Sequence, residues 1–253
     1  MPRATRRRKT RRRGARSGRP ARRGRRRVLR VFFGAIAAVV LATALPLAVL
    51  RFVAPPTTAF MLRSRWNDPA TGLPCGNDVA WRWVDGDAIS PHLALAVVVA
   101  EDQRFLDHHG IDFQGLRHAL RERWRRGRVR GASTISQQLA KNLFLWPHPG
   151  YARKAIEAWI TLWMEALWPK HRILEVYLNV VQFGPCVFGA GAASERYFDH
   201  PPAELTPAEA ALLATVLPSP RKLRAYDPGP YARERRDQIL QLMAQHAWMR
   251  RRL

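Results

Sequence analysis

The chain has 253 residues and a formal net charge of +24, from 43 Lys or Arg against 19 Asp or Glu. Residues 1–30 hold 16 of these basic residues and no acidic residue, which leaves +8 for the remainder. The high charge therefore describes a tail that we expect to be disordered, and it excludes a nucleic-acid binder whose whole surface is basic.

An uncharged segment follows the tail over residues 31–50, with Thr43 as its only polar side chain. Twenty helical residues span about 30 Å, the thickness of the hydrocarbon core of a bilayer. We predict a transmembrane helix over 31–53. The basic flank places residues 1–30 in the cytoplasm and the rest of the chain outside it. The alternative is a cleavable signal peptide, whose apolar region is shorter, roughly 7–15 residues.

Residues 54–89 are predicted to form an extended juxtamembrane connector, because turn residues such as Pro, Asn and Gly are frequent in them. One short strand is expected at 79–84. The apolar residues Phe60, Met61 and Leu62 have two interpretations: they enter the outer leaflet of the membrane, or they pack against the domain.

Two cysteines, Cys75 and Cys186, lie on the side of the membrane that we expect to be exported. That compartment permits a disulfide. A Cys75–Cys186 bridge and two unpaired small side chains are both consistent with the sequence.

From Ser90 onward the sequence predicts a mainly α-helical domain, over 90–228, followed by a basic amphipathic helix within 229–253. Ser90 is typical of an N-cap before a Pro in the first turn. Capping boxes open two more helices. Apolar residues at helical spacing predict others. The cap positions and helical segments are Ser90-Pro91, Thr134-x-x-Gln137, 154–168, 171–181, Thr206-x-x-Glu209 and 231–252.

Three polar clusters in this region are candidates for chemistry. The first places Glu101 and Asp102 at the end of the apolar run 93–100. A carboxylate that is partly desolvated has a raised pKa and can serve as a general base or acid. The alternative is a solvated helix end.

The second cluster spans 131–142, where small and hydroxyl residues precede a helix and leave free N–H groups for an anion. Lys141 lies about two turns into this helix, where it can face the same cleft as Gln137 or Gln138. In the third cluster, Arg153, Lys154 and Glu157 share one helix face. The alternatives are a solvated polar helix face and an ordinary surface ion pair, which contributes little.

Taken in order, these segments resemble the family 51 peptidoglycan glycosyltransferases. Residues 101–110 are similar to the first motif, Glu-Asp-x-x-Phe-x-x-His-x-Gly, and residues 131–142 to the second, Gly-x-Ser-Thr-Ile-x-Gln-Gln with a trailing Lys-Asn. The remaining motifs are matched by 153–157, 173–184 and 205–220. The resemblance covers about 93–228. It implies the monofunctional biosynthetic branch, because no transpeptidase domain follows.

The resemblance implies a lysozyme-like α-helical domain over a cleft, preceded by one N-terminal transmembrane helix. Glu101 is then the general base and Glu157 the second essential carboxylate. The residues implied to bind substrate or pyrophosphate are Lys141, Arg153, Lys154, Ser133, Thr134, Gln137, Gln138 and Asn142. The residues implied to support the motifs are Asp102, Phe105, His108, Gly110, Glu175, Tyr177 and Asn179. The sequence departs from the family pattern at Ala155 and Ile156, which bring no extra cation, and at Cys186.

The implied reaction polymerises lipid II into glycan strands, by inverting transfer of the growing chain from undecaprenyl pyrophosphate to a sugar 4-hydroxyl. A divalent cation, Mg or Mn, is a candidate cofactor, and no organic cofactor is implied. The expected partners are lipid II, the growing glycan, inner-membrane lipids and cell-wall synthesis or division proteins, with no nucleic acid. The expected location is the bacterial inner membrane, with a periplasmic catalytic domain.

Three other functions are alternatives for this sequence. A lytic transglycosylase has no pyrophosphate to neutralise, so the cations at Lys141, Arg153 and Lys154 argue against it. A nucleic-acid binder rests on the tail and on the arginines of 121–130, for which anionic lipid headgroups or the precursor are better partners outside the cytoplasm. A silent cell-wall scaffold is disfavoured by the intact Glu101 and Glu157.

Overall fold

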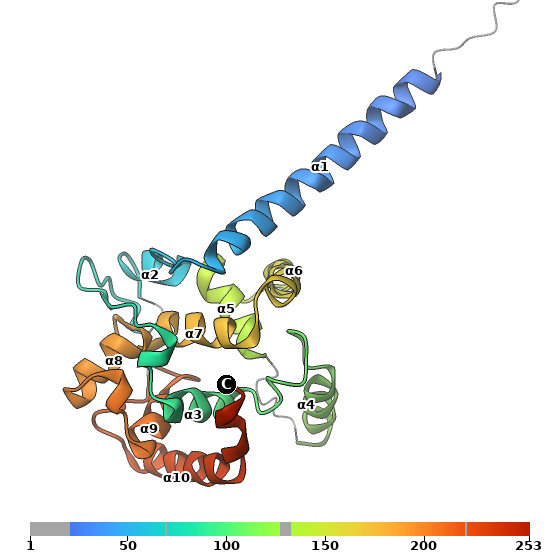
Figure 1. The fold of residues 1–253 in the computed structure, drawn as a ribbon. Helices are drawn as coiled ribbons and strands as arrows, with labels where there is room; N and C mark the ends of the chain where they lie inside the picture. Colours follow the sequence, from blue (N-terminus) through green and yellow to red (C-terminus); the bar gives the residue numbers. More distant parts are fainter. Residues whose placement is uncertain (1–20, 69, 127–132, 221) are drawn as a thin grey trace, which may run out of the picture. The chain divides into compact units, whose positions relative to one another are not determined.

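The computed structural model describes residues 21–68, 70–126, 133–220 and 222–253. The chain divides into two compact units, Met1–Ala42 and Thr43–Leu253. The described residues are mainly α-helical, as predicted, with a long N-terminal helix and one small sheet (Figure 1). The first 20 residues of the basic tail, and residues 127–132 of the arginine-rich and Gly-x-Ser-Thr segments, lie outside the described residues.

The N-terminal helix α1 runs over Ala21–Leu50. Its part from Arg26 to Leu50, 25 residues, is long and apolar enough to cross a membrane. The prediction of a disordered tail up to residue 30 is wrong for Ala21–Arg30, which is helical. Arginine is a good helix former, and a helix that the apolar segment has nucleated extends easily into such a flank.

The end of α1 belongs to the second unit and packs into it. Leu47 is only 1% exposed. The Trp168 indole N–H donates to the Leu47 carbonyl at 2.7 Å, and the Arg172 guanidinium donates to the carbonyls of Leu50 at 2.9 Å and Val53 at 2.8 Å. Carbonyls at a helix C-terminus have no partner inside the helix. Arg172 supplies one to Leu50, the last residue of α1, while Trp168 shares the Leu47 carbonyl with the Arg51 N–H. These bonds make the last turns of α1 part of the domain.

The second unit holds a succession of short helices. The α-helices are α2 (Ala59–Ser64), α3 (Pro91–Glu101), α4 (Phe113–Arg126), α5 (Ile135–Phe144), α6 (Tyr151–Leu167), α7 (Lys170–Val180), α8 (Gly189–Phe198), α9 (Pro207–Val216) and α10 (Pro230–Gln245). The 3₁₀ segments are η1 (Gly86–Ala88), η2 (Pro202–Glu204) and η3 (Ala247–Arg251). The sequence had not indicated α2, α4 or α8.

Helix starts followed the predicted caps closely. The Ser90 hydroxyl accepts the His92 N–H at 3.3 Å at the start of α3. At the start of α5, Thr134 accepts the Gln137 N–H and the Gln137 side chain accepts the Thr134 N–H, both at 3.2 Å. The same capping box opens α9. Side chains that satisfy the first N–H groups are local features, so sequence predicts them well.

Two groups of helices form the core. In one, α3 packs against α9 and α10, and in the other α5 packs against α6 and α7 (Figure 1). Residues 229–253, which were predicted as a separate terminal segment, thus contribute α10 to the core, and Ile239 is buried there. The predicted terminal helix ends at Gln245, and η3 follows it.

A small sheet joins the connector to the segment after α7. Its strands are β1 (Ala80–Trp81), β2 (Gln182–Gly184) and β3 (Val187–Phe188), in the order β1-β3-β2. Strand β1 is parallel to β3 and β2 is antiparallel to it, with Ala80 opposite Val187 and Trp81 opposite Phe188. The expected strand at 79–84 is therefore present but shorter.

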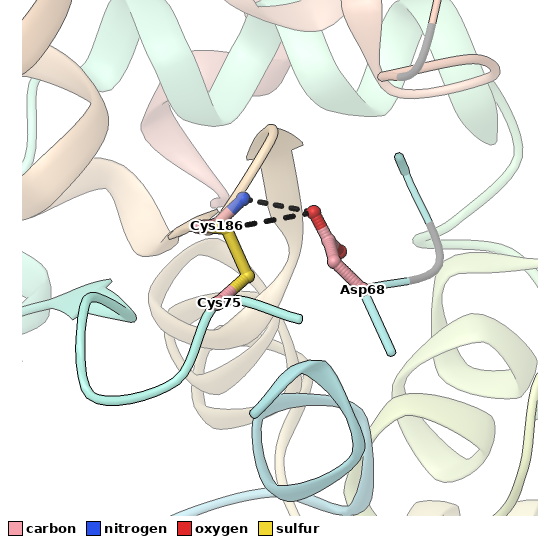
Figure 2. A group of neighbouring side chains, drawn as sticks. All are labelled: Asp68, Cys75 and Cys186. Atoms are coloured by element: carbon pink, nitrogen blue, oxygen red, sulfur yellow. Dashed lines mark hydrogen bonds between the residues drawn. A yellow bond between two sulfur atoms is a disulfide. The ribbon is translucent and has the colours of Figure 1, made fainter. Parts of the chain in front are cut away.

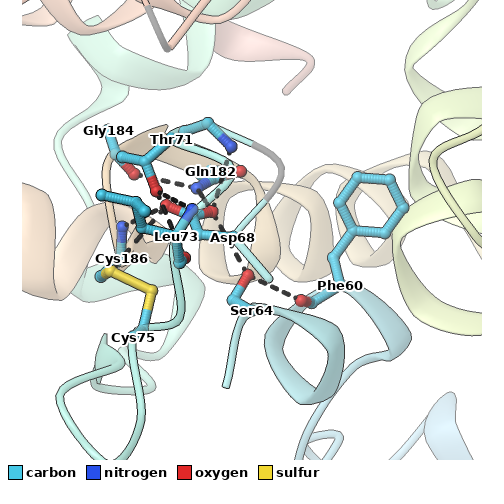
Figure 3. The surroundings of a disulfide bond; sticks show 10 residues. Phe60, Ser64, Asp68, Thr71, Leu73, Cys75, Gln182, Gly184 and Cys186 are labelled. Atoms are coloured by element: carbon cyan, nitrogen blue, oxygen red, sulfur yellow. Dashed lines mark hydrogen bonds between the residues drawn. A yellow bond between two sulfur atoms is a disulfide. The ribbon is translucent and has the colours of Figure 1, made fainter. Parts of the chain in front are cut away.

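The connector is held to this sheet by a disulfide between Cys75 and Cys186. Beside it lies the fully buried carboxylate of Asp68, which accepts the Cys186 N–H at 3.0 Å (Figure 2). Asp68 also accepts the Gln182 amide at 2.5 Å and the Ala70 N–H at 3.1 Å (Figure 3). A covalent bond and a buried carboxylate thus fix the connector at the same place.

The connector is more compact than predicted. Thr58 caps α2, and Phe60 and Met61 on this helix are buried in the core. Of the two interpretations, membrane insertion and packing against the domain, the structure supports packing for Phe60 and Met61. Leu62 faces outward and is 40% exposed.

The disulfide closes a loop with a sequence separation of 111 residues. Removal of such a cross-link frees the unfolded chain, so we expect the free energy of unfolding to fall by about 2–5 kcal/mol. The measurement is chemical unfolding of the detergent-solubilised protein with and without a thiol reductant. A Cys75→Ser/Cys186→Ser variant serves as control and should ignore the reductant. Equal midpoints for oxidised and reduced wild type would contradict the expectation.

Candidate active site

Glu101 ends α3 and lies against α5. The Gln138 amide donates to its carboxylate at 2.7 Å, and the Tyr177 hydroxyl donates to the Gln138 carbonyl oxygen at 2.8 Å. Burial raises the pKa of the Glu101 carboxyl, and the Gln138 hydrogen bond and the charges of Arg235 and Lys141 oppose that rise. The result is a half-buried carboxylate that holds its proton to higher pH than an exposed glutamate.

Asp102, the next residue, ties α3 to the start of α5. Its buried carboxylate accepts the Ile135 N–H at 3.0 Å and lies 3.0 Å from Nε2 of His108. Nδ1 of His108 accepts the Gly110 N–H at 3.1 Å, which leaves Nε2 to donate to Asp102. One carboxylate therefore organises the whole turn after α3.

Gly110 occupies a place that no larger residue fits. Its φ is +87°, and a Cβ there would lie 2.6 Å from the Thr161 side chain on α6. Its carbonyl accepts the Thr134 hydroxyl at 2.6 Å. Phe105 is fully buried below the same turn. The residues predicted to support the first motif thus shape the turn and dock it onto α5 and α6.

Glu157 on α6 gathers the cations of the third predicted cluster. Its side chain is buried, and it accepts Arg153 Nη1 at 2.6 Å and a hydrogen bond from Lys154 Nζ. Lys154 Nζ also donates to the Ser133 hydroxyl at 3.2 Å. Arg153 Nε is buried and has no hydrogen-bond partner among the described residues. We call Glu157, Arg153, Lys154 and Ser133 the Glu157 cluster. Both of its cationic side chains bind the Glu157 carboxylate.

Lys141 connects this cluster to Glu101. Burial lowers the pKa of the Lys141 ammonium, the Glu157 and Glu101 carboxylates oppose this, and the charges of Arg153 and Lys154 lower it further. Lys141 is therefore within electrostatic reach of both carboxylates and both other cations. The structure thus brings Glu101, Lys141 and the Glu157 cluster near one another, and their roles as base and anion-binding groups stay predictions.

Other predicted binding residues lie deeper. Thr134 and Gln137 are buried in the capping box at the start of α5, and Asn142 is buried further along it. Their contacts position the helix rather than open onto a cleft, and direct substrate contact by them stays a prediction. Gly131 and Ala132 of the same motif lie outside the described residues.

On α7, two predicted motif residues hold the connector. Glu175 accepts the Gly86 N–H at 3.0 Å and Arg172 Nη1 at 2.7 Å. The Asn179 amide exchanges two 2.8 Å hydrogen bonds with the backbone of Val84. These residues tie α7 to the connector, whereas Tyr177 on the same helix is linked to Glu101 through Gln138.

Sequence reasoning missed a buried polar network below the site. Glu165 on α6 accepts hydrogen bonds from the Ser136 hydroxyl and from Lys170 Nζ, the latter at 2.8 Å. Lys170 also lies 4.5 Å from the centre of the Phe105 ring. The available signal was a glutamate inside an apolar helix face. The electrostatic effect of Arg235 on Glu101 was missed as well, because α10 lies far away in sequence.

A divalent cation is poorly matched to these side chains. Among the described residues, the one group of three close metal-ligating side chains is Asp68, Cys75 and Cys186, and its two sulfurs are bonded to each other. In the site, Glu157 is engaged by two cationic side chains and Glu101 by Gln138. The residues do not form a cage for a metal ion.

A sequence model described as Transglycosylase matches residues 72–244. The chain belongs to the transglycosylase family. The matched range includes α3 to α9 and all but the last residue of α10. Every residue of the site of this transglycosylase lies inside it.

Three similar proteins share one description, biosynthetic peptidoglycan transglycosylase. The one from Aeromonas hydrophila is 45% identical over 216 residues, 85% of this chain and 86% of the relative. That from Xylella fastidiosa (strain 9a5c) is 45% identical over 200 residues, 78% of this chain and 81% of the relative. That from Xanthomonas campestris pv. campestris (strain B100) is 44% identical over 220 residues, 86% and 87% respectively. These relatives have a length similar to that of this transglycosylase.

Glu157→Gln keeps the shape of the side chain but leaves Arg153 and Lys154 without their shared carboxylate. We expect the free energy of unfolding to fall by about 1–3 kcal/mol, because a buried hydrogen-bonded charge pair is broken. Glu195→Gln is the matched control, since its carboxylate forms an exposed pair with Arg82 at 3.4 Å. That change should stay within about 0.5 kcal/mol. Chemical unfolding of both variants tests this, and equal effects would refute a buried role for Glu157.

Proposed function

We propose that this transglycosylase polymerises lipid II into glycan strands. The growing chain passes from undecaprenyl pyrophosphate to the 4-hydroxyl of the acceptor sugar. Family membership and the relatives support the coarser statement, that the protein is a peptidoglycan glycosyltransferase of cell-wall synthesis. The observation that carries the finer one is the position of Lys141, within electrostatic reach of both Glu101 and the Glu157 cluster.

Glu101 is the general base of the proposed reaction. A sugar hydroxyl is a poor nucleophile at neutral pH, so a base must accept its proton as it attacks the anomeric carbon. Burial raises the pKa of Glu101 and makes it a stronger base than an exposed carboxylate. Gln138 donates to one carboxylate oxygen, which orients the group for this proton transfer.

Lys141, Arg153 and Lys154 stabilise the leaving group. A lipid pyrophosphate leaves as an anion and needs cations rather than an acid. Glu157 holds Arg153 and Lys154 in place by charge-assisted hydrogen bonds. Because the base and the cations are separate groups, one displacement at the anomeric carbon suffices, and the configuration there is inverted.

No step of the proposal requires a divalent cation, since the protein's own cations neutralise the pyrophosphate. Polymerisation of lipid II measured with and without a chelator tests whether the reaction depends on Mg or Mn.

The apolar helix α1 would anchor the enzyme in the inner membrane, with the basic N-terminus in the cytoplasm and the domain in the periplasm. Both substrates carry polyprenyl tails, so confinement to the same membrane raises their effective concentration at the site. Anionic lipids are the expected neighbours of the basic flank. Other cell-wall synthesis or division proteins are candidate partners.

Glu101→Gln removes the base and preserves the hydrogen-bonding shape. We expect polymerisation of labelled lipid II by the detergent-solubilised protein to fall by about 10²-fold or more, the effect of losing a general base. Glu234→Gln, an exposed carboxylate on α10, is the matched control and should retain activity. Polymer formed at the wild-type rate by Glu101→Gln would remove Glu101 from the mechanism.

The pH dependence of polymerisation should report the raised pKa of Glu101. Only the deprotonated carboxylate accepts a proton, so kcat falls as the pH is lowered through this pKa. Since burial raises the pKa, the fall should begin above the usual glutamate range of about 4.3. A kcat profile at saturating lipid II tests this, and a midpoint at or below that range would contradict it.

A further inference from the structure

We propose that Tyr177 is a positioning residue for the general base, and that it acts on Glu101 through the side-chain amide of Gln138. The inference rests on the proposed function, because it takes Glu101 to be the base. It assigns to the α7 tyrosine a part in the reaction without any contact to substrate.

The three side chains come from three helices and form one hydrogen-bonded chain. Tyr177 on α7 donates to Oε1 of Gln138 on α5 at 2.8 Å, and Nε2 of Gln138 donates to Oε2 of Glu101 on α3 at 2.7 Å. A carboxylate can only accept, so the NH₂ end of the amide must face Glu101. The oxygen end then faces Tyr177, which must be the donor.

The rigid member of this chain is the tyrosine. Tyr177 is 0% exposed and packs in the core, whereas Glu101 and Gln138 are both half-buried. A glutamine amide rotates about its last bond, and its two ends are nearly the same size. The Glu101 carboxylate can only accept and so fixes the orientation of the amide, and the Tyr177 hydroxyl holds the amide in that place by donating to its oxygen end.

Loss of the hydroxyl removes the buried donor that anchors the Gln138 oxygen. The amide then gains by moving toward other partners that can donate to this oxygen. Its NH₂ end is held less firmly against the Glu101 carboxylate. The base is then held in fewer productive orientations, and its charged form is less favourable.

The tyrosine is suited to this role over the working range of the enzyme. Complete burial raises the pKa of the Tyr177 hydroxyl well above 10, and the nearby Glu101 and Asp102 carboxylates raise it further. The hydroxyl therefore keeps its proton and remains a donor. A group that titrated near neutral pH would fail to fix the amide.

The groups that face Glu101 are known from each packed element. Asp102 adjoins it at the end of α3, Lys141 and Gln138 face it from α5, Arg235 from α10 and Tyr177 from α7. Replacement of Tyr177 by phenylalanine changes no charge among them. A shift in the pH profile of that variant therefore reports the hydrogen-bonded chain itself.

The test is Tyr177→Phe, with polymerisation of lipid II by the full-length solubilised enzyme as the assay. We expect kcat at neutral pH to fall about five- to tenfold, the order of one lost hydrogen bond between neutral groups. KM should change little, and the acid limb of the kcat profile should move to higher pH, because the Gln138 bond that favours the carboxylate is weakened. Tyr197→Phe is the matched control, a partly buried tyrosine on α8 that stacks on Tyr226 with ring centres 5.6 Å apart. It should leave both quantities unchanged.

A double-variant comparison isolates the route through the amide. Gln138→Ala should move the acid limb in the same direction, and addition of Tyr177→Phe to it should cause no further loss of kcat. A further loss of about five- to tenfold in the double variant, or a loss of kcat in Tyr177→Phe with an unmoved acid limb, would overturn the proposal. Full activity of Glu101→Gln would instead overturn the assignment of the base, so the two failures are distinguishable.

Discussion

The buried carboxylate of Asp102 fixes the relation between α3 and α5, and the rest of the site depends on that relation. It accepts a backbone N–H from the first residue of α5 and lies at hydrogen-bond distance from His108, whose other nitrogen accepts the Gly110 N–H. The end of one helix and the start of another are thereby joined through charge-assisted hydrogen bonds. Glu101 precedes Asp102 directly, so the same bonds deliver the proposed base to Gln138.

The site separates two chemical requirements and then connects them. Among the residues that the structure describes, no cationic side chain contacts Glu101 directly, and its half-burial favours proton uptake. The buried Glu157 binds two cations, which in the proposed reaction serve the anionic leaving group. Lys141 is influenced by both halves. Burial and the neighbouring cations lower the pKa of Lys141, and the Glu157 and Glu101 carboxylates raise it. The charge of Lys141 therefore depends on both halves of the site. An incoming pyrophosphate would add negative charge and favour the charged ammonium further.

Sequence was most informative where the structure is local. Caps at Ser90, Thr134 and Thr206 depend on residues two or three positions apart, and their helices begin where predicted. The ion pairs of Glu157 likewise follow from spacings of three and four residues. The bond from Tyr177 to Gln138 and that from Asp68 to Cys186 join segments 39 and 118 residues apart, and only the packing of helices sets them. The helical start of α1 in a basic flank was missed because charge, rather than helix propensity, dominated its interpretation.

The disulfide also sets an order of events during synthesis. Cys75 is made 111 residues before Cys186, and the chain contains two cysteines in all. Its thiol therefore has no correct partner until Glu101, Lys141, Glu157 and Tyr177 have all been translated. The native bridge can therefore form only in a chain in which these four residues are already present.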